Sequence, residues 1–229
     1  GDFGTERSRL ADIHAAAYAN SVISAAHAAR GAGAGRVVGV GHSMGGVPLT
    51  FAVATEPDLF DGVIYVAALA PAIDTPAGTF LALPEQRQKS RLTEILHGDP
   101  EAIGALRINP ASSDTTYLET AHAALAADVS PAVFAKTFAR LTPDAPYGIY
   151  GEVPAFTIGN SGSFGVIPRR FIRCLNDQTL VPSSANAIIK TLNEHWPKRQ
   201  TEVLDLASAH EPMLSCPQRL AQVIMAPPV

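Results

Sequence analysis

A serine nucleophile is the first chemistry that the residue types and their spacing suggest. Residues 41–45 read Gly-His-Ser-Met-Gly, which matches the pattern G-x-S-x-G. In this pattern the serine lies on a strained turn between a strand and a helix, and the glycines allow the close packing that exposes its hydroxyl. The backbone N–H of Met44 would face the oxyanion of an acyl-transfer intermediate, at a helix N-terminus that favours negative charge. We therefore expect Ser43 to be a nucleophile.

The surrounding sequence strengthens this interpretation of Ser43. The pattern alone should arise by chance in about one chain in ten, because glycine makes up about 7% of protein residues. Here a short apolar run over residues 36–40 precedes the pattern, and an apolar helical stretch follows it from Gly46 to about Glu56. Strand, sharp turn and helix in this order are the context that a true nucleophile requires.

An acid and a base for Ser43 follow further along the chain. A serine relay on a strand–turn–helix needs them in the order serine, acid, histidine. Asp177 and His210 each come shortly after an apolar run that reads as a strand, so both should lie at the sheet edge where Ser43 lies. Asp177 would orient the imidazole, and His210 would take the Ser43 proton and return it to the leaving alcohol.

Alternatives remain open for these residues. Asp177 could only form a turn, and His210 could be an ordinary loop histidine. Asp74, which follows an earlier strand, is the best alternative acid, whereas Asp205 falls within a strand. His42 is expected to pack or hydrogen-bond beside the nucleophile and not to act as the base. The other histidines lack matching partners and are expected at the surface: His14, His27, His97, His122 and His195.

The two cysteines, Cys174 and Cys216, indicate no metal or thiol chemistry. They are compatible with one disulfide, but not with a disulfide framework or a zinc site with paired ligands. Cys174 should face the core from its strand, and Cys216 has no acid–base relay of its own. We expect no metal and no cofactor. We favour a cytoplasmic setting, although the chain begins with Gly1, which leaves room for a removed targeting signal.

Periodicity predicts the elements that position these residues. An alanine-rich helix is expected at about residues 7–30, and strand, helix and strand within residues 36–67 imply parallel strands. The α/β rhythm resumes late in the chain, which gives a sheet of at least four parallel strands. The later expected elements are strands at 170–174 and 202–206 and helices at 184–194 and 217–223.

The region between these two parts contains no convincing strand. Helical stretches at about 120–127 and 132–141 are separated by prolines. We interpret residues 71–167 as a helical lid insertion over the site, and residues 1–70 and 168–229 as the core of one α/β domain.

Composition excludes several classes of protein. The 229 residues are 47% hydrophobic and 17% charged, so the chain can form a core and shows no sign of disorder. A net charge of -4 without a long basic run argues against binding to nucleic acid or to an anionic membrane. No segment approaches the roughly 18 apolar residues of a membrane span. The expected partner is a small-molecule ester, and a homodimer is compatible with the sequence.

The motifs together resemble the α/β-hydrolase superfamily. They lie in residues 41–46, 167–182 and 209–217. The resemblance is greatest to the branch of plant methyl esterases, hydroxynitrile lyases and bacterial esterase relatives, to which residues 141–146 are also similar. It implies an α/β-hydrolase fold, with a mostly parallel sheet flanked by helices and a helical lid. The motifs are specific for the superfamily and do not identify a substrate.

The resemblance also implies roles for individual residues. Ser43, Asp177 and His210 match the nucleophile, acid and base, and Met44 matches the residue that supplies one oxyanion N–H. One departure concerns the residue after the catalytic histidine. Hydroxynitrile lyases of this branch carry a lysine there, whereas this chain has Glu211. The lyase interpretation therefore loses its stabiliser for the departing cyanide.

A second departure concerns the N-terminus. The family begins with a strand, an oxyanion loop, a helix and another strand, all before the segment that starts here. We therefore expect the N-terminal part of the sheet to be absent, with roughly 35–45 residues upstream of Gly1. These residues would supply the second oxyanion donor. Without them, the apolar strand at 36–40 would be an exposed edge and an aggregation hazard.

Ester hydrolysis is the function that these observations favour. The chain is expected to be a carboxylesterase-type serine hydrolase, which cleaves a small, fairly hydrophobic ester through an acyl-enzyme on Ser43. Two alternatives stay open. One is a hydroxynitrile lyase-like or other non-hydrolytic use of the same residues. The other is an inactive, receptor-like binding protein that keeps the fold.

Overall fold

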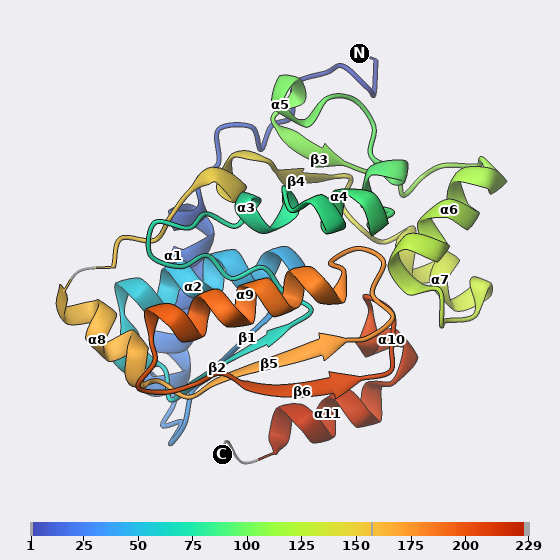
Figure 1. Cartoon of the computed structure of the whole chain (residues 1–229). Coiled ribbons are helices and arrows are strands. Elements are labelled where there is room, and N and C mark those ends of the chain that lie inside the picture. The colour runs from blue at the N-terminus through green and yellow to red at the C-terminus, as the bar shows by residue number, and fades with distance from the viewer. Residues whose placement is uncertain (1, 157, 227–229) are drawn as a thin grey trace.

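A parallel sheet forms the centre of the molecule. The computed structural model describes residues 2–156 and 158–226. Its 4-stranded sheet has the order β1-β2-β5-β6, and every neighbouring pair is parallel (Figure 1). The strands are β1 (Val38–His42), β2 (Gly62–Val66), β5 (Arg169–Cys174) and β6 (Glu202–Leu206). The prediction of at least four parallel strands is therefore confirmed.

Helices cover both faces of this sheet (Figure 1). Val63 and Tyr65 point to one face, where they join the core formed with α1, α2 and α9. Ile64 and Val66 point to the other face, where they pack with α11. Burial on both faces is usual for parallel strands. The helices around the sheet are α1 (Ala15–Gly31), α2 (Gly46–Thr55), α8 (Ile158–Val166), α9 (Pro182–His195), α10 (Pro212–Ser215) and α11 (Pro217–Met225), with short 3₁₀ turns η1 (Ser43–Gly45) and η2 (Pro57–Leu59).

The start of α1 differs from the prediction. The helix begins at Ala15, eight residues later than expected. The residues before it are held by long-range contacts, since Arg107 donates to the backbone carbonyls of Phe3 and Glu6 at 2.6 and 2.8 Å. The carboxylate of Glu152 accepts the N–H of Ala15 at 3.2 Å and so caps the helix. Local periodicity carries no information about such distant partners.

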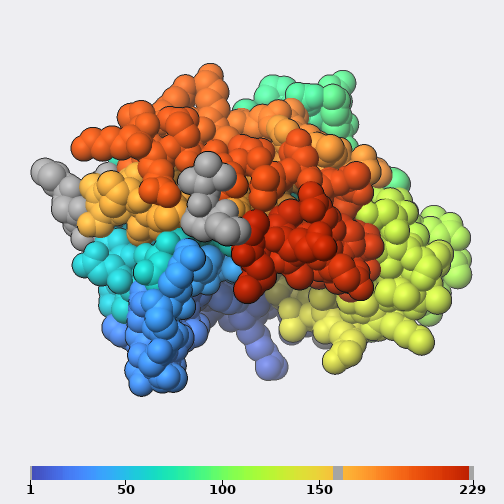
Figure 2. Space-filling view, turned by 90° about the horizontal axis from the view of Figure 1, so that it is seen from below, coloured from blue at the N-terminus to red at the C-terminus, as the bar shows by residue number. Residues whose placement is uncertain are grey.

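Strand β1 lies at an edge of the sheet and begins two residues later than predicted. Among the residues that the structure describes, it pairs with β2 alone. Val38 and Val40 are 39% and 48% exposed. Together with Ile64 and Ile224 they line a cavity of about 380 Å³ on the face that carries α11. Figure 2 looks onto this face, with α11 in red. The predicted exposed edge is therefore present.

The segment between β2 and α8 contains helices α3 to α7, but the prediction that it lacks strands is wrong. Strands β3 (Ala105–Arg107) and β4 (Asp144–Pro146) form an antiparallel pair. Arg107 and Asp144 join them by two hydrogen bonds of 2.6 and 2.8 Å. Each strand has only 3 residues, too few for alternation to reveal. The helices of this segment are α3 (Gly78–Leu81), α4 (Pro84–Lys89), α5 (Pro100–Ile103), α6 (Thr115–Ala126) and α7 (Pro131–Phe138), with 3₁₀ turns η3 (Leu92–Ile95) and η4 (Gly148–Gly151).

The division into a core (residues 1–70 and 168–229) and a lid (residues 71–167) stays a prediction. An apolar cluster of its own, which includes Ile95, Leu125 and Phe134, supports a separate lid. Helix α8 does not fit that division, because it packs against α2 and its Phe164 belongs to the main core. The segment over the site is therefore described below as residues 71–156.

Candidate active site

Ser43 lies on the sharp turn between β1 and α2. Its φ of 52° is in the left-handed region, which is costly for a residue with a side chain. Close packing holds this turn. A Cβ atom on Gly41 would lie 2.8 Å from the carbonyl oxygen of Gly45, and one on Gly46 would lie 2.2 Å from that of Leu69. Gly45 itself faces open space, so the second glycine of the G-x-S-x-G pattern is not required by packing.

Three of the predicted site residues meet at this turn. The Ser43 hydroxyl oxygen is 2.8 Å from Nε2 of His210. The other ring nitrogen of His210, Nδ1, is 2.7 Å from a carboxylate oxygen of Asp177. The structure thus brings Ser43, His210 and Asp177 together from three segments that follow β1, β6 and β5. They meet because the carboxyl ends of parallel strands share one edge of the sheet.

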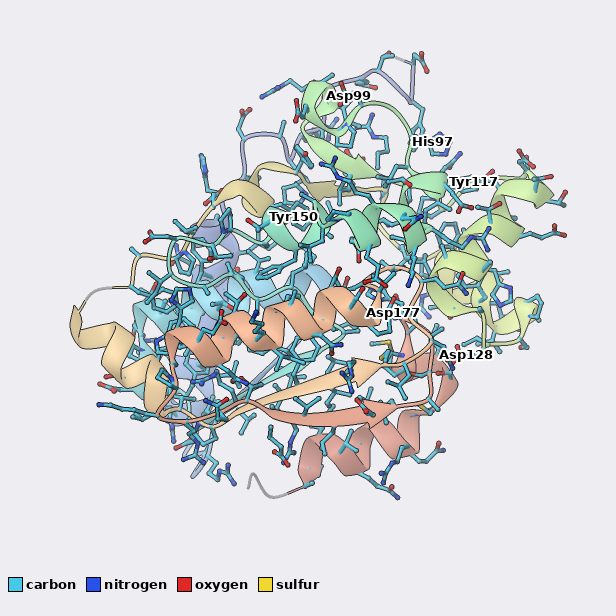
Figure 3. The ribbon with its side chains drawn as sticks, in the orientation of Figure 1. His97, Asp99, Tyr117, Asp128, Tyr150 and Asp177 are labelled. Carbon is cyan, nitrogen blue, oxygen red and sulfur yellow. The ribbon has the colours of Figure 1, made fainter. Side chains whose placement is uncertain are left out.

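Asp177 is buried at the end of β5 (Figure 3). One carboxylate oxygen faces His210, and the other accepts the backbone N–H groups of Thr179 and Leu180 at 2.7 and 2.9 Å. The loop therefore fixes the orientation of its own acid. The alternative acids lie elsewhere: Asp74 is exposed in the turn after β2, and Asp205 is paired with an arginine of β5 at 2.9 Å.

The electrostatic surroundings of His210 favour its protonated form. Burial by itself would lower the pKa of His210. The charge of Asp177, the hydrogen bond with Asp177 and the charge of Glu211 act against burial, and the net result is a pKa above the ordinary value. These groups stabilise the imidazolium that a general base becomes when it takes a proton.

Two residues outside the predicted site position the loop of His210. His42 donates from Nε2 to the backbone carbonyl of His210 at 2.8 Å, and their rings lie 4.8 Å apart. Burial and the charge of His210 lower the pKa of His42, so it stays a neutral donor. Asp128, at the turn between α6 and α7, accepts the N–H of Ala209 at 2.8 Å (Figure 3). His42 could be suspected from its position beside Ser43, but nothing local marks Asp128.

Met44 occupies the place expected of an oxyanion donor. It is the second residue of η1, where a backbone N–H has no acceptor within the helix. The role of Met44 stays a prediction.

Two neighbouring cavities lie at the site. A small one of about 30 Å³ is bordered by Ser43 and apolar side chains. A second, of about 270 Å³, is lined by residues of α3, α4, η3, β3 and η4. The two cavities have four lining residues in common: Leu81, Leu92, Leu106 and Tyr150. This shared wall places the larger cavity directly beside the space at Ser43.

Comparison with known proteins agrees with this geometry. The model of the alpha/beta hydrolase family matches residues 2–223. The chain belongs to this family. No curated relative matches the α/β-hydrolase described here. Among solved structures, a pyrethroid hydrolase from Sphingobium faniae JZ-2 is 23% identical, with a TM-score of 0.71 over 98% of this chain and 79% of that chain. Polyneuridine aldehyde esterase is 18% identical, with a TM-score of 0.70 over 95% of this chain and 81% of that chain.

A third similar structure is an extracellular alpha/beta-hydrolase from a Paenibacillus species. It is 12% identical, with a TM-score of 0.65 over 93% of this chain and 79% of that chain. At such identities the likeness shows the fold alone. The predicted α/β-hydrolase fold, with its mostly parallel sheet flanked by helices, is thereby confirmed.

The α/β-hydrolase site also holds side chains that could bind a metal ion. His42, His210 and Glu211 offer ligand atoms that lie within 4.8 Å of one another. However, both ring nitrogens of His210 are hydrogen-bonded, to Ser43 and to Asp177. A metal ion held by His210 would have to break this relay. The expectation of no metal and no cofactor stays a prediction.

Other predicted features of the α/β-hydrolase have mixed outcomes. Cys174 and Cys216 are free thiols, and burial raises the pKa of Cys174 to about 12, which keeps it protonated. The placement of all five remaining histidines at the surface is wrong for two, His97 and His122, which are half-buried. Such burial is possible because His122, for example, donates to the backbone carbonyl of Val129 at 2.7 Å. None of the described helices is long and apolar enough to cross a membrane.

Proposed function

We propose that this α/β-hydrolase cleaves a small, fairly hydrophobic carboxylic ester through an acyl-enzyme on Ser43. The observation that supports it most is the continuous relay from the Ser43 oxygen to His210, at 2.8 Å, and from His210 to Asp177, at 2.7 Å. At these distances His210 can take the serine proton while Asp177 holds the ring with Nε2 toward the serine. One solved neighbour is named an esterase and another a hydrolase, which agrees with this proposal.

Each half-reaction moves one proton through His210. First, Nε2 takes the Ser43 proton while the serine oxygen bonds to the ester carbonyl carbon. The tetrahedral intermediate then loses the alcohol, which leaves with the proton from His210. Next, His210 takes a proton from water, whose oxygen attacks the acyl carbon, and the proton returns to Ser43 as the carboxylic acid departs. The N–H of Met44 stabilises the oxyanion in both steps.

The cavities support an apolar substrate of limited size. The space beside Ser43 has a volume of only about 30 Å³ and is lined by side chains such as Leu69 and Leu180. A small group of the ester fits there. A longer apolar arm has room in the adjoining cavity of about 270 Å³. Burial of such an arm contributes to binding in proportion to the apolar area removed from water.

Glu211 argues against use of the relay for cyanide release. Its carboxylate lies within 4.8 Å of ligand atoms of His42 and His210. A lysine at this place would attract a departing cyanide ion, as in the lyases that the chain resembles. A carboxylate there repels a cyanide ion instead, because two negative charges repel, most of all away from bulk water.

The proposal is tested with a fluorophosphonate probe, a p-nitrophenyl ester and a cyanohydrin. We expect the probe to label Ser43, and Ser43→Ala to lose both labelling and about 10⁶-fold in kcat. Ser113→Ala, which removes an exposed hydroxyl, is the control and should behave as wild type. A folded protein that is neither labelled nor active would be a receptor-like member, and cyanide release from the cyanohydrin would establish a lyase.

A further inference from the structure

Tyr150 is one of the four residues that border both cavities at the site. It is only 6% exposed, and it lines both the space of about 30 Å³ beside Ser43 and the cavity of about 270 Å³ next to it. Tyr150 lies in η4, against helix α3, since a Cβ atom on Gly78 would come within 3.0 Å of its backbone oxygen (Figure 3). An ester arm that runs from Ser43 into the larger cavity therefore crosses a boundary to which Tyr150 contributes.

The hydroxyl of Tyr150 has no hydrogen-bond partner among the described residues, and burial alone raises its pKa. The hydroxyls of the buried Tyr65 and the half-buried Tyr117 differ from it. The Tyr65 hydroxyl bonds to that of Thr50 at 2.8 Å, and the Tyr117 hydroxyl donates to the Ile95 carbonyl at 2.9 Å. Buried polar groups are nearly always satisfied in folded proteins. Among the described residues, the Tyr150 hydroxyl is therefore a neutral donor that is free to bond to a group that enters the cavities it lines.

The other buried or half-buried polar side chains around the larger cavity offer less. Both ends of the Gln86 amide are used by backbone groups, the carbonyl of Thr179 at 2.6 Å and the N–H of Val181 at 3.0 Å. The Ser90 hydroxyl donates to the same Thr179 carbonyl at 2.8 Å. Tyr147 also lines this cavity but is half-buried and reaches solvent. Tyr150 thus carries the buried donor that remains available.

We propose that Tyr150 donates a hydrogen bond to a second oxygen of the substrate, on the arm that enters the larger cavity. The inference rests on the proposed function and specifies its substrate class. The preferred esters carry an ether, carbonyl or hydroxyl oxygen away from the scissile bond, within an otherwise apolar arm. An ester with a plain hydrocarbon arm fits the same space but leaves the Tyr150 donor buried and unpaired, which costs selectivity.

The test compares matched esters that differ in one atom. In p-nitrophenyl pentanoate an oxygen replaces each chain methylene in turn, and the same series is made on the alcohol side of acetate esters. For each oxygen position we take the ratio of kcat/KM for the oxygen-containing ester to kcat/KM for the hydrocarbon ester. At one position this ratio should be about tenfold higher in wild type than in Tyr150→Phe, because one neutral hydrogen bond contributes about that much. When the wild-type ratio is divided by the ratio in Tyr150→Phe, differences in the intrinsic reactivity of the esters cancel. Tyr147→Phe is the control and should keep the wild-type preference.

A binding measurement separates this inference from the proposed function. In a Ser43→Ala background the same esters bind without turnover, and calorimetry should show the oxygen preference lost on adding Tyr150→Phe. Equal ratios in wild type and Tyr150→Phe in both series, or an equal loss in Tyr147→Phe, would overturn the role of Tyr150. Preferential binding without Ser43-dependent hydrolysis would instead overturn the esterase proposal alone. Tyr150→Phe should also unfold at no lower denaturant concentration than wild type, because the hydroxyl of Tyr150 bonds to none of the described residues.

Discussion

Different interactions hold the turn of Ser43 and the loops of Asp177 and His210. The serine turn depends on close packing of backbone against backbone. Gly46 leaves no room for a Cβ atom, which would lie 2.2 Å from the carbonyl oxygen of Leu69, and the N–H of Leu69 in turn donates to the carbonyl of Ser43 at 3.0 Å. These backbone partners belong to the segment from β1 to Leu69, just after β2.

The acid and base loops depend on side-chain hydrogen bonds, one from His42 to the base loop and others from residues 71–156. Gln86 of α4 bridges the carbonyl of Thr179 and the N–H of Val181, just after Asp177. Asp128 holds the N–H of Ala209, just before His210. The segment over the site is therefore more than a cover for substrate. It also holds the loops that align the acid and the base.

This difference implies that the nucleophile and its relay can be disturbed separately. A change in residues 71–156 should leave the Ser43 turn intact while it misaligns Asp177 and His210. A change at the glycines should weaken the fold around Ser43 without an effect on the acid loop. The following experiments test the division, in order of expected effect.

The largest effect concerns which carboxylate belongs to the relay. Asp177→Asn should lower kcat by about 10⁴, because an amide at this position no longer holds the imidazole in the right tautomer. Asp74→Asn is the matched control and should cost little, since Asp74 is exposed in the turn after β2. Steady-state turnover of a p-nitrophenyl ester measures both. The opposite ranking would assign the acid to Asp74, outside the loop that Gln86 supports. The proposed role of residues 71–156 in aligning the acid would then be wrong.

The next effect concerns packing at the serine turn. Gly46→Ala should destabilise the protein by about 3 kcal/mol, because the added methyl meets a backbone oxygen that cannot move aside. The backbone at Gly46 is ordinary helix, with φ -68° and ψ -28°, so the loss reports sterics alone. Gly45→Ala, which faces open space, should stay within about 0.5 kcal/mol of wild type. Chemical denaturation followed by circular dichroism compares the two, and equal losses would contradict the packing argument.

The same contrast explains which parts of the structure sequence reasoning could predict. Short local patterns in the sequence predict the parallel strands, the Ser43 turn and the order of Asp177 and His210. The contacts of Gln86 and Asp128 are not, because they join residues 93 and 81 positions apart. Such partners become neighbours only through the path of the whole chain.

The sequence could not predict the free hydroxyl of Tyr150, for a related reason. A tyrosine in an apolar context predicts burial, but not whether its hydroxyl finds a partner. The short strands β3 and β4 were not predicted because 3 residues cannot show the alternation of a strand.

A smaller effect tests the support of the acid loop. Gln86→Ala should lower kcat by up to about 10²-fold, because loss of its bridge lets Asp177 shift relative to His210. It should also cost about 1–3 kcal/mol of stability, since the buried N–H of Val181 loses its acceptor. Gln88→Ala, on the exposed side of the same helix, is the matched control.

The rate of labelling by a small fluorophosphonate isolates the alignment of the relay from substrate binding. This distinction matters because Gln86 also lines the larger cavity. The labelling rate should fall with kcat in Gln86→Ala. A labelling rate equal to that of wild type would show that Gln86 acts on the substrate pocket alone.

The smallest effect concerns the charge that tunes His210. His210 acts as a base only when neutral, so kcat/KM should fall as the pH drops through its pKa. Burial pushes this pKa down, but the charge of Asp177, the hydrogen bond with Asp177 and the charge of Glu211 outweigh burial, so the midpoint should lie above 6.5. Glu211→Gln removes one raising contribution and keeps the Asp177 hydrogen bond. The midpoint should therefore move to lower pH, while the rate on the alkaline plateau changes little.

Two control variants test whether the shift in the midpoint depends on the charge at Glu211. Glu119→Gln, on the exposed surface of α6, removes the same charge far from the relay and should leave the midpoint in place. Gly46→Ala disturbs the packing of the serine turn without a change in charge and should also leave the midpoint in place. An unchanged midpoint in Glu211→Gln would mean that the carboxylate at 211 is screened by solvent. A shift in Gly46→Ala would mean that the packing of the serine turn sets the proton affinity of His210, and the two parts could then not be disturbed separately.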